Sequence, residues 1–233
     1  MSLPLIDVPM YDLVIPSTKQ KIKFRPYLVK EQKILLMANT GDNIDETLES
    51  IKQVIKNCTF DKVNIDILPL FDIEFIFLQL RAKSVGEVVE PIIECRNCKN
   101  NIQLSVNLTD IQVKFPSTSN KIEITPKVGI IFKYPTVEIE KKIEANKDNI
   151  SQNYQLLYEC IDNVYDENQV YTKKDFSYDE FVEFIENLNS DQFEKVLNFF
   201  SDQPTLSKTI EYTCSKCQTK GNIELKGLLD FLA

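Results

Sequence analysis

The chain of 233 residues contains no histidine, no tryptophan and only five glycines. Without histidine it lacks the commonest general base, the histidine-dependent serine and cysteine triads, and every metal site that uses an imidazole ligand. The scarcity of glycine disfavours a phosphate-binding loop, and the sequence has no Walker loop, dinucleotide fingerprint, nucleophile elbow or calcium loop. We therefore expect a protein that is not an enzyme and has no small-molecule substrate.

Basic residues are too few for a nucleic-acid binder. The sequence has 27 Lys and Arg residues against 35 Asp and Glu residues, a formal net charge of -8, whereas nucleic-acid-binding surfaces are basic. The acidic excess lies between Thr136 and Phe200. It indicates either solvated helix faces or an acidic surface that keeps a basic partner soluble. No nucleic acid is expected as a partner.

Long hydrophobic runs are also missing. The most apolar stretch, Ile67 to Leu80, contains Pro69, Asp72 and Glu74, and is too short and too charged to span a bilayer. Residues 1–9 do not have the pattern of a signal peptide. We expect no membrane contact and an intracellular location, where cysteines are reduced thiols or metal ligands before they are disulfides.

Residues 1–87 are predicted to form an N-terminal β-hairpin followed by a three-helix unit. Alternating apolar residues on both sides of Pro16-Ser17-Thr18 predict the hairpin. Apolar residues three or four apart predict a helix over 28–38 and a second one that includes Leu48 to Cys58. Cys58 lies on the apolar face, which indicates a core residue. The nearly all-apolar stretch Leu68 to Lys83 predicts a central buried helix.

The rest of the chain is predicted to combine a β portion with an inserted acidic helical unit. Residues 88–134 and 205–233 alternate as strands do, and they form the β portion. Residues 135–204 return to the helical period and form the insertion, with Ser177 to Glu180 as a capping box. Its candidate helices are 136–146, 150–163, 177–188 and 191–201. The predicted fold class is α+β.

Four of the six cysteines form two C-x-x-C pairs, Cys95 with Cys98 and Cys214 with Cys217. Each pair lies in a turn between two short β segments, and polar residues follow its second cysteine. Two such turns that face each other create a tetrahedral four-sulfur site, the preferred geometry of structural zinc. We therefore predict that these four cysteines bind one structural zinc ion in a zinc-ribbon-like site. With four protein ligands the site is closed and does not catalyse.

Three other interpretations of the cysteines stay open. They could be reduced thiols without a metal, or the ligands of an iron–sulfur cluster, which four thiolates also suit. A redox C-x-x-C is disfavoured because neither pair begins a helix after a strand. Cys160 lies at helical spacing near Leu156 and Leu157, and we predict that it is a core residue.

Two stretches carry a resemblance to a known family. The first, Val8 to Ala38, contains VPxYxLxIPST and FRPYLVKE, and the second, Phe71 to Glu87, ends in LRAKSVGE. Together they resemble the baseplate hub assembly proteins of T-even-like tailed bacteriophages, over most of the first 110 residues. Past Asp110 the only feature that fits the same fold is the closing C-x-x-C.

The resemblance implies assembly of the central hub of a contractile tail baseplate, without enzymatic activity. Other phage baseplate hub proteins are then the partners, and the location is the host cytoplasm during assembly or the virion tail baseplate. One alternative is a permanent structural hub subunit of the virion, and another is a zinc-ribbon regulator that binds host machinery. The polar residues in the matching stretches are interpreted as docking residues or as ion pairs at helix ends: Arg25, Lys30, Glu31, Arg81 and Lys83.

Overall fold

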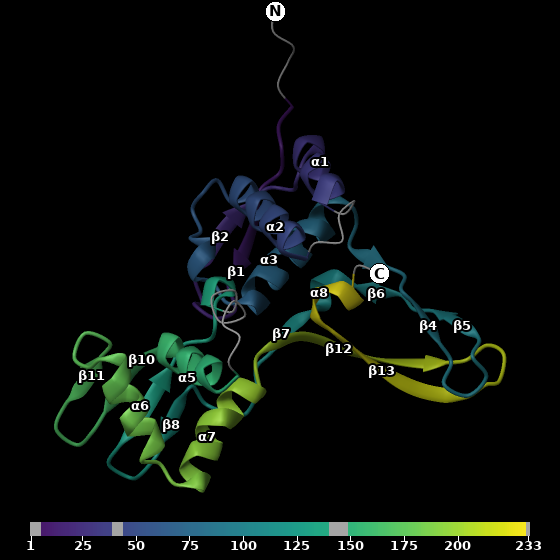
Figure 1. The fold of residues 1–233 in the computed structure, drawn as a ribbon. Coiled ribbons are helices and arrows are strands. Elements are labelled where there is room, and N and C mark those ends of the chain that lie inside the picture. Colours follow the sequence, from purple (N-terminus) through teal and green to yellow (C-terminus); the bar gives the residue numbers. More distant parts are fainter. Residues whose placement is uncertain (1–5, 39–43, 140–148, 232–233) are drawn as a thin grey trace, which may run out of the picture. The chain divides into compact units, whose positions relative to one another are not determined.

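The computed structural model describes residues 6–38, 44–139 and 149–231. The chain divides into two compact units (Figure 1): unit 1 comprises Met1–Lys114 and Thr205–Ala233, and unit 2 comprises Phe115–Pro204. Both units combine helices with small antiparallel sheets, which confirms the predicted α+β class. Within the described ranges, no helix has the length and apolar character that a membrane span requires.

Unit 1 consists of a hairpin, helices and short strands that surround a central helix. Its elements in chain order are β1 (Tyr11–Val14), β2 (Lys21–Phe24), α1 (Val29–Ala38), α2 (Ile44–Cys58), η1 (Ile65–Ile67), α3 (Leu70–Ser84), β3 (Val88–Val89), β4 (Ile92–Glu94), β5 (Asn101–Gln103), β6 (Val106–Asn107), η2 (Leu108–Asp110), β7 (Gln112–Lys114), β12 (Thr205–Thr213), β13 (Lys220–Lys226) and α8 (Gly227–Asp230).

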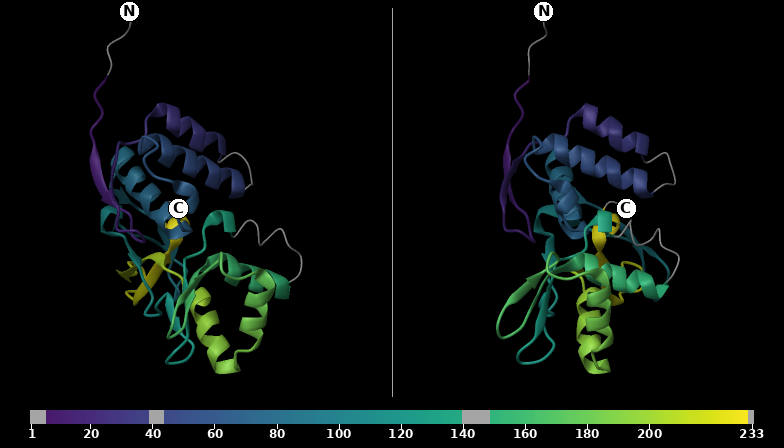
Figure 2. Two further views of the ribbon diagram at one scale, coloured as in Figure 1. Left: turned by 90° about the vertical axis from the view of Figure 1, so that its left-hand side faces the viewer. Right: turned by 60° about the vertical axis from the view of Figure 1, so that its left-hand side comes forward.

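The predicted N-terminal hairpin and three helices are present. β1 and β2 pair antiparallel, with Tyr11 opposite Phe24, and α1 packs beside α2 (Figure 2). Helix α3 buries nine of its fifteen residues and contacts α2, α8, η2, β7 and β12, as expected of a central helix. It begins at Leu70, two residues later than predicted, because Pro69 is its extended N-cap.

Two buried acidic side chains are held by groups at the ends of the hairpin strands. Asp72 in α3 accepts hydrogen bonds from the backbone N–H (3.1 Å) and the hydroxyl of Ser17 in the hairpin turn. After β2, Nη2 of Arg25 lies 2.9 Å from Oε1 of Glu31. Glu31 also accepts the N–H of Leu28 at 2.9 Å. Arg25 and Glu31 are both buried, so they form an internal ion pair that fixes the start of α1.

The other polar residues of the matching stretches lie at helix ends. Arg81 donates to the carbonyl of Gly86 at 3.0 Å, beyond the end of α3. Lys83 forms an ion pair with Glu87. Lys30 is largely exposed, with its Nζ 3.7 Å from Glu31. The contacts of Lys30 and Lys83 agree with their interpretation as ion pairs at helix ends, whereas Arg81 instead donates to a carbonyl beyond its helix.

Two hairpins and the short antiparallel pair β3–β6 make up most of the β portion of unit 1. β12 and β13 pair over seven positions, from Ser207 opposite Lys226 to Thr213 opposite Lys220, and β7 adds to the other edge of β12. β4 and β5 form a shorter hairpin, in which Ile93 lies opposite Ile102. No residue of β4 or β5 is fully buried. The apolar contacts of these two strands are therefore few, and other interactions must fix their position.

Unit 2 consists of a four-stranded antiparallel sheet, in the order β11-β10-β9-β8, and the helices that pack with it. Its described elements in chain order are β8 (Lys121–Glu123), β9 (Gly129–Phe132), α5 (Asn149–Cys160), β10 (Ile161–Tyr165), β11 (Val170–Thr172), α6 (Tyr178–Glu186) and α7 (Ser190–Ser201).

The insertion is not purely helical, which corrects the sequence prediction. The helix expected over 150–163 ends at Cys160, because Ile161–Tyr165 pairs with both β9 and β11. The strands β8 and β9 belong to this sheet as well. Helices α6 and α7 match the predicted 177–188 and 191–201, and the capping box at Ser177 is confirmed. The candidate helix 136–146 lies mostly outside the described residues.

Aromatic side chains form much of the core of unit 2. Phe199 stacks on Phe132 and on Tyr134, with ring centroids 5.5 Å apart in each pair. The buried Phe181 and Cys160 belong to the same apolar cluster, so the prediction of a core position for Cys160 is confirmed.

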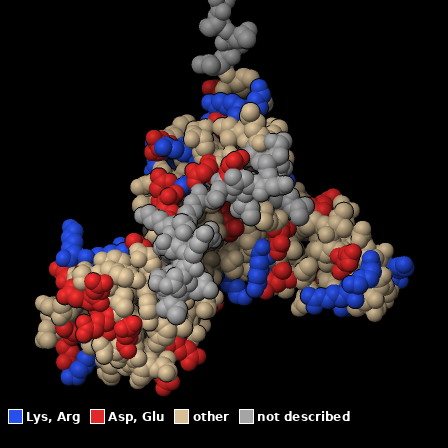
Figure 3. Space-filling model, viewed as in Figure 1, with Lys and Arg blue, Asp and Glu red and all other residues tan. Residues whose placement is uncertain are grey.

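Unit 2 carries the net charge of the whole chain. It contains 17 acidic and 9 basic residues, a net charge of -8, whereas unit 1 contains 18 of each. Figure 3 shows acidic side chains gathered on one face of unit 2, over the part that contains α6. The acidic excess found in the sequence between residues 136 and 200 therefore lies within one compact unit.

Candidate metal centre

The four cysteines of the two C-x-x-C pairs come together in unit 1. Cys95 and Cys98 lie in the turn between β4 and β5, and Cys214 and Cys217 lie in the turn between β12 and β13. The tips of the two hairpins lie side by side (Figure 1). The sequence predicts this convergence, although 115 residues separate Cys98 from Cys214.

The two cysteine turns have the same backbone conformation. In each turn the N–H of the first cysteine donates to the carbonyl five residues later, and the N–H four residues later donates back to the carbonyl of that cysteine, all at 2.9 Å. The residue after the second cysteine has a positive φ in both turns, 57° at Lys99 and 56° at Gln218. Equal spacing has thus produced two equivalent turns that bring both sulfurs of each pair to one side.

The distances between the sulfur atoms fit a single metal ion. The Sγ atoms of Cys95 and Cys217 are 3.7 Å apart, and those of Cys98 and Cys214 are 3.6 Å apart. All four lie within 4.8 Å of one another. Tetrahedral zinc with Zn–S bonds of about 2.3 Å places its sulfur ligands about 3.8 Å apart. No disulfide joins them, so all four thiols are available as ligands.

Backbone amides around the cluster stabilise thiolates, the form in which cysteine binds metals. The hydroxyl and the N–H of Thr219 lower the pKa of Cys217 to about 5. The N–H groups of Cys217 and Lys216 lower the pKa of Cys214. The N–H of Asn100 also favours the Cys98 thiolate, but burial and hydrogen bonds with the other three thiols outweigh it and raise the pKa of Cys98 to about 12.

A second layer of polar contacts connects the two turns. Nδ2 of Asn97, in the first turn, donates to Oγ1 of Thr219 in the second turn at 3.2 Å. The same oxygen lies 3.2 Å from Sγ of Cys217. Such contacts orient a ligand and tune its basicity. Sequence reasoning missed both residues, although Thr219 stands two positions after its second cysteine, as Asn100 does in the other turn.

The remaining two cysteines are not part of the cluster. Cys58 is fully buried on α2, and burial raises its pKa to about 11. Cys160 is buried in unit 2. The predictions that both are core residues are confirmed. The four cysteines of the cluster are thus the ones that can bind a soft or borderline metal ion. In this cluster Cys95 and Cys214 are buried, and Cys98 and Cys217 are partly exposed.

Comparison with known proteins identifies a family and no individual relative. Neither the curated proteins nor the solved structures give a match to this chain. The family model described as "T4 bacteriophage base plate protein" matches residues 8–233. This match covers the two N-terminal stretches that carry the resemblance, both cysteine turns and unit 2. The chain therefore belongs to the T4 bacteriophage base plate protein family.

Proposed function

We propose that the chain is a non-enzymatic assembly protein for the central hub of a contractile phage tail baseplate, and that it acts by binding other hub proteins. The family match over residues 8–233 carries this proposal. It agrees with a sequence without histidine. The neutral unit 1 and the acidic unit 2 also offer partners two surfaces of different charge.

Recovery of partners from infected cells tests the proposal. An affinity-tagged chain, expressed during infection, is expected to retain phage hub proteins, which mass spectrometry identifies. A tagged phage protein from outside the tail is the control. Retention of host RNA polymerase in place of hub proteins would contradict the assembly role and favour the regulatory alternative.

An inventory of purified virions distinguishes an assembly factor from a permanent hub subunit. An assembly factor that leaves before completion is expected in baseplate intermediates and absent from finished tails. A fixed copy number in every tail would instead show that the chain is a structural hub subunit. Quantitative mass spectrometry of intermediates and of virions from the same infection gives both measurements.

We further propose that Cys95, Cys98, Cys214 and Cys217 hold one structural zinc ion. The sulfur separations fit the edges of a tetrahedron around zinc. A four-iron cluster needs room for its own iron and sulfide atoms between the thiolates, and sulfurs within 4.8 Å of one another do not leave this room. Basic residues in and beside the turns, among them Arg96, Lys99, Lys216 and Lys220, offset the negative charge of four thiolates around a divalent ion.

Elemental analysis of the purified chain tests the zinc proposal. We expect one zinc ion per chain and no iron. Cys217→Ser is expected to abolish stoichiometric zinc, whereas Cys160→Ala, which alters a cysteine outside the cluster, is expected to keep it. Metal-free protein in which the four cysteines of the cluster are free thiols, or an iron content equal to the protein concentration, would overturn the proposal.

A further inference from the structure

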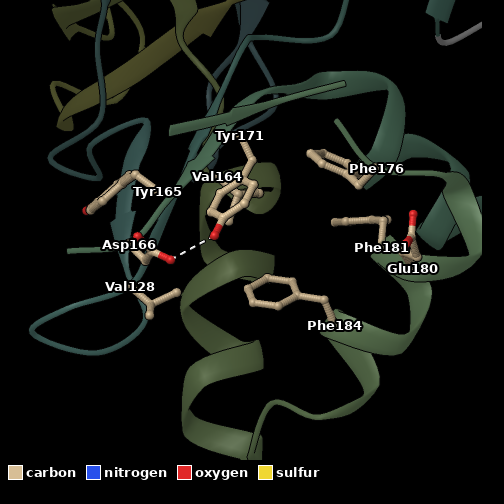
Figure 4. A pocket seen from close by; sticks show the side chains of 9 residues that line it. All are labelled: Val128, Val164, Tyr165, Asp166, Tyr171, Phe176, Glu180, Phe181 and Phe184. Atoms are coloured by element: carbon tan, nitrogen blue, oxygen red, sulfur yellow. Dashed lines mark hydrogen bonds between the residues drawn. The ribbon is translucent and has the colours of Figure 1, made fainter. Parts of the chain in front are cut away.

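A pocket of about 320 Å³ opens on unit 2. Strands β10 and β11 and helix α6 contribute its walls, together with residues just before β9, just after β10 and between β11 and α6 (Figure 4). Its lining is mostly aromatic, with carboxylates at two places: Val128, Val164, Tyr165, Asp166, Tyr171, Phe176, Glu180, Phe181 and Phe184. None of these lining residues, all of which lie in the described part of the chain, is basic.

Asp166 is fixed as an ionised group at one side of the pocket. Its Oδ1 accepts the N–H groups of Asn168 (2.7 Å) and Gln169 (2.9 Å), and its Oδ2 accepts the hydroxyl of Tyr171 at 2.9 Å. These bonds lower the pKa of Asp166. In Figure 4 the ring of Phe184 lies below Tyr171, while Glu180 lies on the opposite side of the pocket from Asp166. The Asp166 carboxylate thus stands beside the ring of Tyr171, and the ring of Phe184 lines the same pocket.

Unit 2 already binds its own cations with these components. Nζ of Lys173 lies 4.9 Å from the ring centroid of Tyr158 and 3.2 Å from a carboxylate oxygen of Glu159. Nζ of Lys121 similarly lies 4.9 Å from the ring centroid of Tyr165, whose side chain points away from the other labelled residues in Figure 4. An aromatic ring beside a carboxylate attracts a cation through the ring quadrupole and the charge. The pocket has the rings and the carboxylate, but its lining supplies no cation.

We propose that this pocket binds an arginine side chain presented by a partner protein, with the guanidinium against Asp166 and the aliphatic stem along Tyr171 and Phe184. Arginine fits better than lysine because its planar guanidinium stacks on rings and donates to a carboxylate in a fixed geometry. The net charge of -8 on unit 2 attracts a basic segment to this unit. The inference rests on the proposed function, because it assumes that the chain acts by binding other proteins.

Titration of the purified full chain with short peptides tests the pocket directly. The probe is acetyl-Gly-Arg-Gly-amide, and the matched peptide carries citrulline, which keeps the shape and removes the charge. The methyl groups of Val128 and Val164, which line the pocket, report binding by NMR. We expect saturable shifts of both with the arginine peptide and none with citrulline. Equal shifts from both peptides, or none from either at tens of millimolar, would overturn the assignment.

Two variants with the same change in net charge separate the pocket from the general acidity of unit 2. Asp166→Asn keeps an oxygen acceptor for the two backbone N–H groups, and we expect it to weaken arginine binding about fivefold. Glu186→Gln removes an exposed carboxylate from the same helix as Phe184, outside the lining, and is expected to leave binding unchanged. Equal weakening by both would show attraction by net charge alone.

The pocket and the assembly role can fail separately. If the native chain retains hub proteins but binds no arginine peptide, only the pocket assignment fails. If it binds the arginine peptide but retains no hub proteins, the assembly role is overturned instead.

Discussion

The tips of the hairpins in unit 1 and the core of unit 2 are held together by different means. In unit 1, the strands β4 and β5 bury no residue completely, and they meet β12 and β13 at four converging sulfurs. In unit 2, a four-stranded sheet and three helices, two of them with capping boxes, surround a continuous cluster of aromatic and aliphatic side chains. A short hairpin with few apolar contacts needs a ligand cluster to fix it, whereas a sheet covered by helices does not.

This difference teaches where each unit is vulnerable. Two-stranded hairpins are marginally stable alone in water. We therefore expect the β4–β5 hairpin to depend on its cysteines and on the zinc ion that we propose they bind. The aromatic core of unit 2 depends on close packing, and it contains a single cysteine, Cys160, that lies outside the sulfur cluster. Damage to one unit is therefore expected to leave the other intact.

The largest effect is expected from the loss of one ligand in the cluster. Structural zinc supplies on the order of 10 kcal/mol of binding free energy in small domains. If the cluster holds the proposed zinc ion, we expect Cys217→Ser to release it and to speed amide hydrogen exchange in residues 92–103 and 213–220, with little change in unit 2. Peptide-level exchange measured by mass spectrometry reads both units in one experiment. Unchanged exchange at the two tips would show that the sulfurs do not hold them.

The reverse experiment removes an aromatic side chain from unit 2. Phe199 is almost completely buried and stacks on two other rings. Truncation of such a side chain costs about 4 kcal/mol, so Phe199→Ala is expected to speed exchange throughout unit 2 while the zinc content stays at one per chain. Leu197→Ala, at a partly exposed position of the same helix, is the matched control and is expected to have little effect. Loss of zinc from Phe199→Ala would contradict the independence of the units.

The sequence predicts the features that depend on local pattern. The C-x-x-C pairs are visible because identical spacing between two β segments recurs around Cys95 and Cys214, and the capping box at Ser177 is a local signal. Strand β10 is not visible in this way. Residues Ile161–Tyr165 continue directly from a helix, and their strand conformation depends on pairing with β9, about thirty residues earlier in the chain. Pairing between distant segments has no signature in a single sequence window.

The pocket and the sulfur cluster differ in the same respect. The cluster is built from two turns with a recognisable spacing, so its four cysteines could be named in advance. The pocket is built from residues on two strands, one helix and the loops beside them, and none of them is distinctive alone. Asp166 and Phe184 read as an ordinary polar turn residue and an ordinary core residue until the fold brings them together.

A third test concerns a buried polar link in unit 1. Burial alone raises the pKa of Glu31, but the hydrogen bonds from Arg25 and from the N–H of Leu28 outweigh it and lower the pKa below its ordinary value. Removal of one partner from a buried ion pair leaves the other charge uncompensated, at a cost of about 3 kcal/mol. We expect Glu31→Gln to destabilise unit 1 by this amount at pH 7 in denaturant unfolding. Lys30→Gln, which changes an exposed neighbour, is expected to cost less than about 0.5 kcal/mol.

The pH dependence of this variant identifies the charge as the cause. Because the pKa of Glu31 is lower in the folded chain than in the unfolded chain, its contribution is complete above the unfolded value of about 4.3. That contribution is lost as the pH falls through the lower folded value. The difference in the free energy of unfolding between the native chain and Glu31→Gln is therefore expected to shrink as the pH falls from 5 to 3. A difference that stays constant over this range would point to lost packing.

The smallest expected effect is a gain in stability at the cysteine turns. Lys99 and Gln218 have φ of 57° and 56°, a left-handed conformation that costs a residue with a Cβ atom about 1 kcal/mol and costs glycine almost nothing. We expect Lys99→Gly to stabilise the β4–β5 tip by up to about 1 kcal/mol, measured as slower amide exchange in residues 92–103. Lys99→Ala removes the same charge and keeps the Cβ atom, so it is expected to give no gain. Equal gains from both variants would show that removal of the lysine charge, and not relief of backbone strain at Lys99, stabilises the tip.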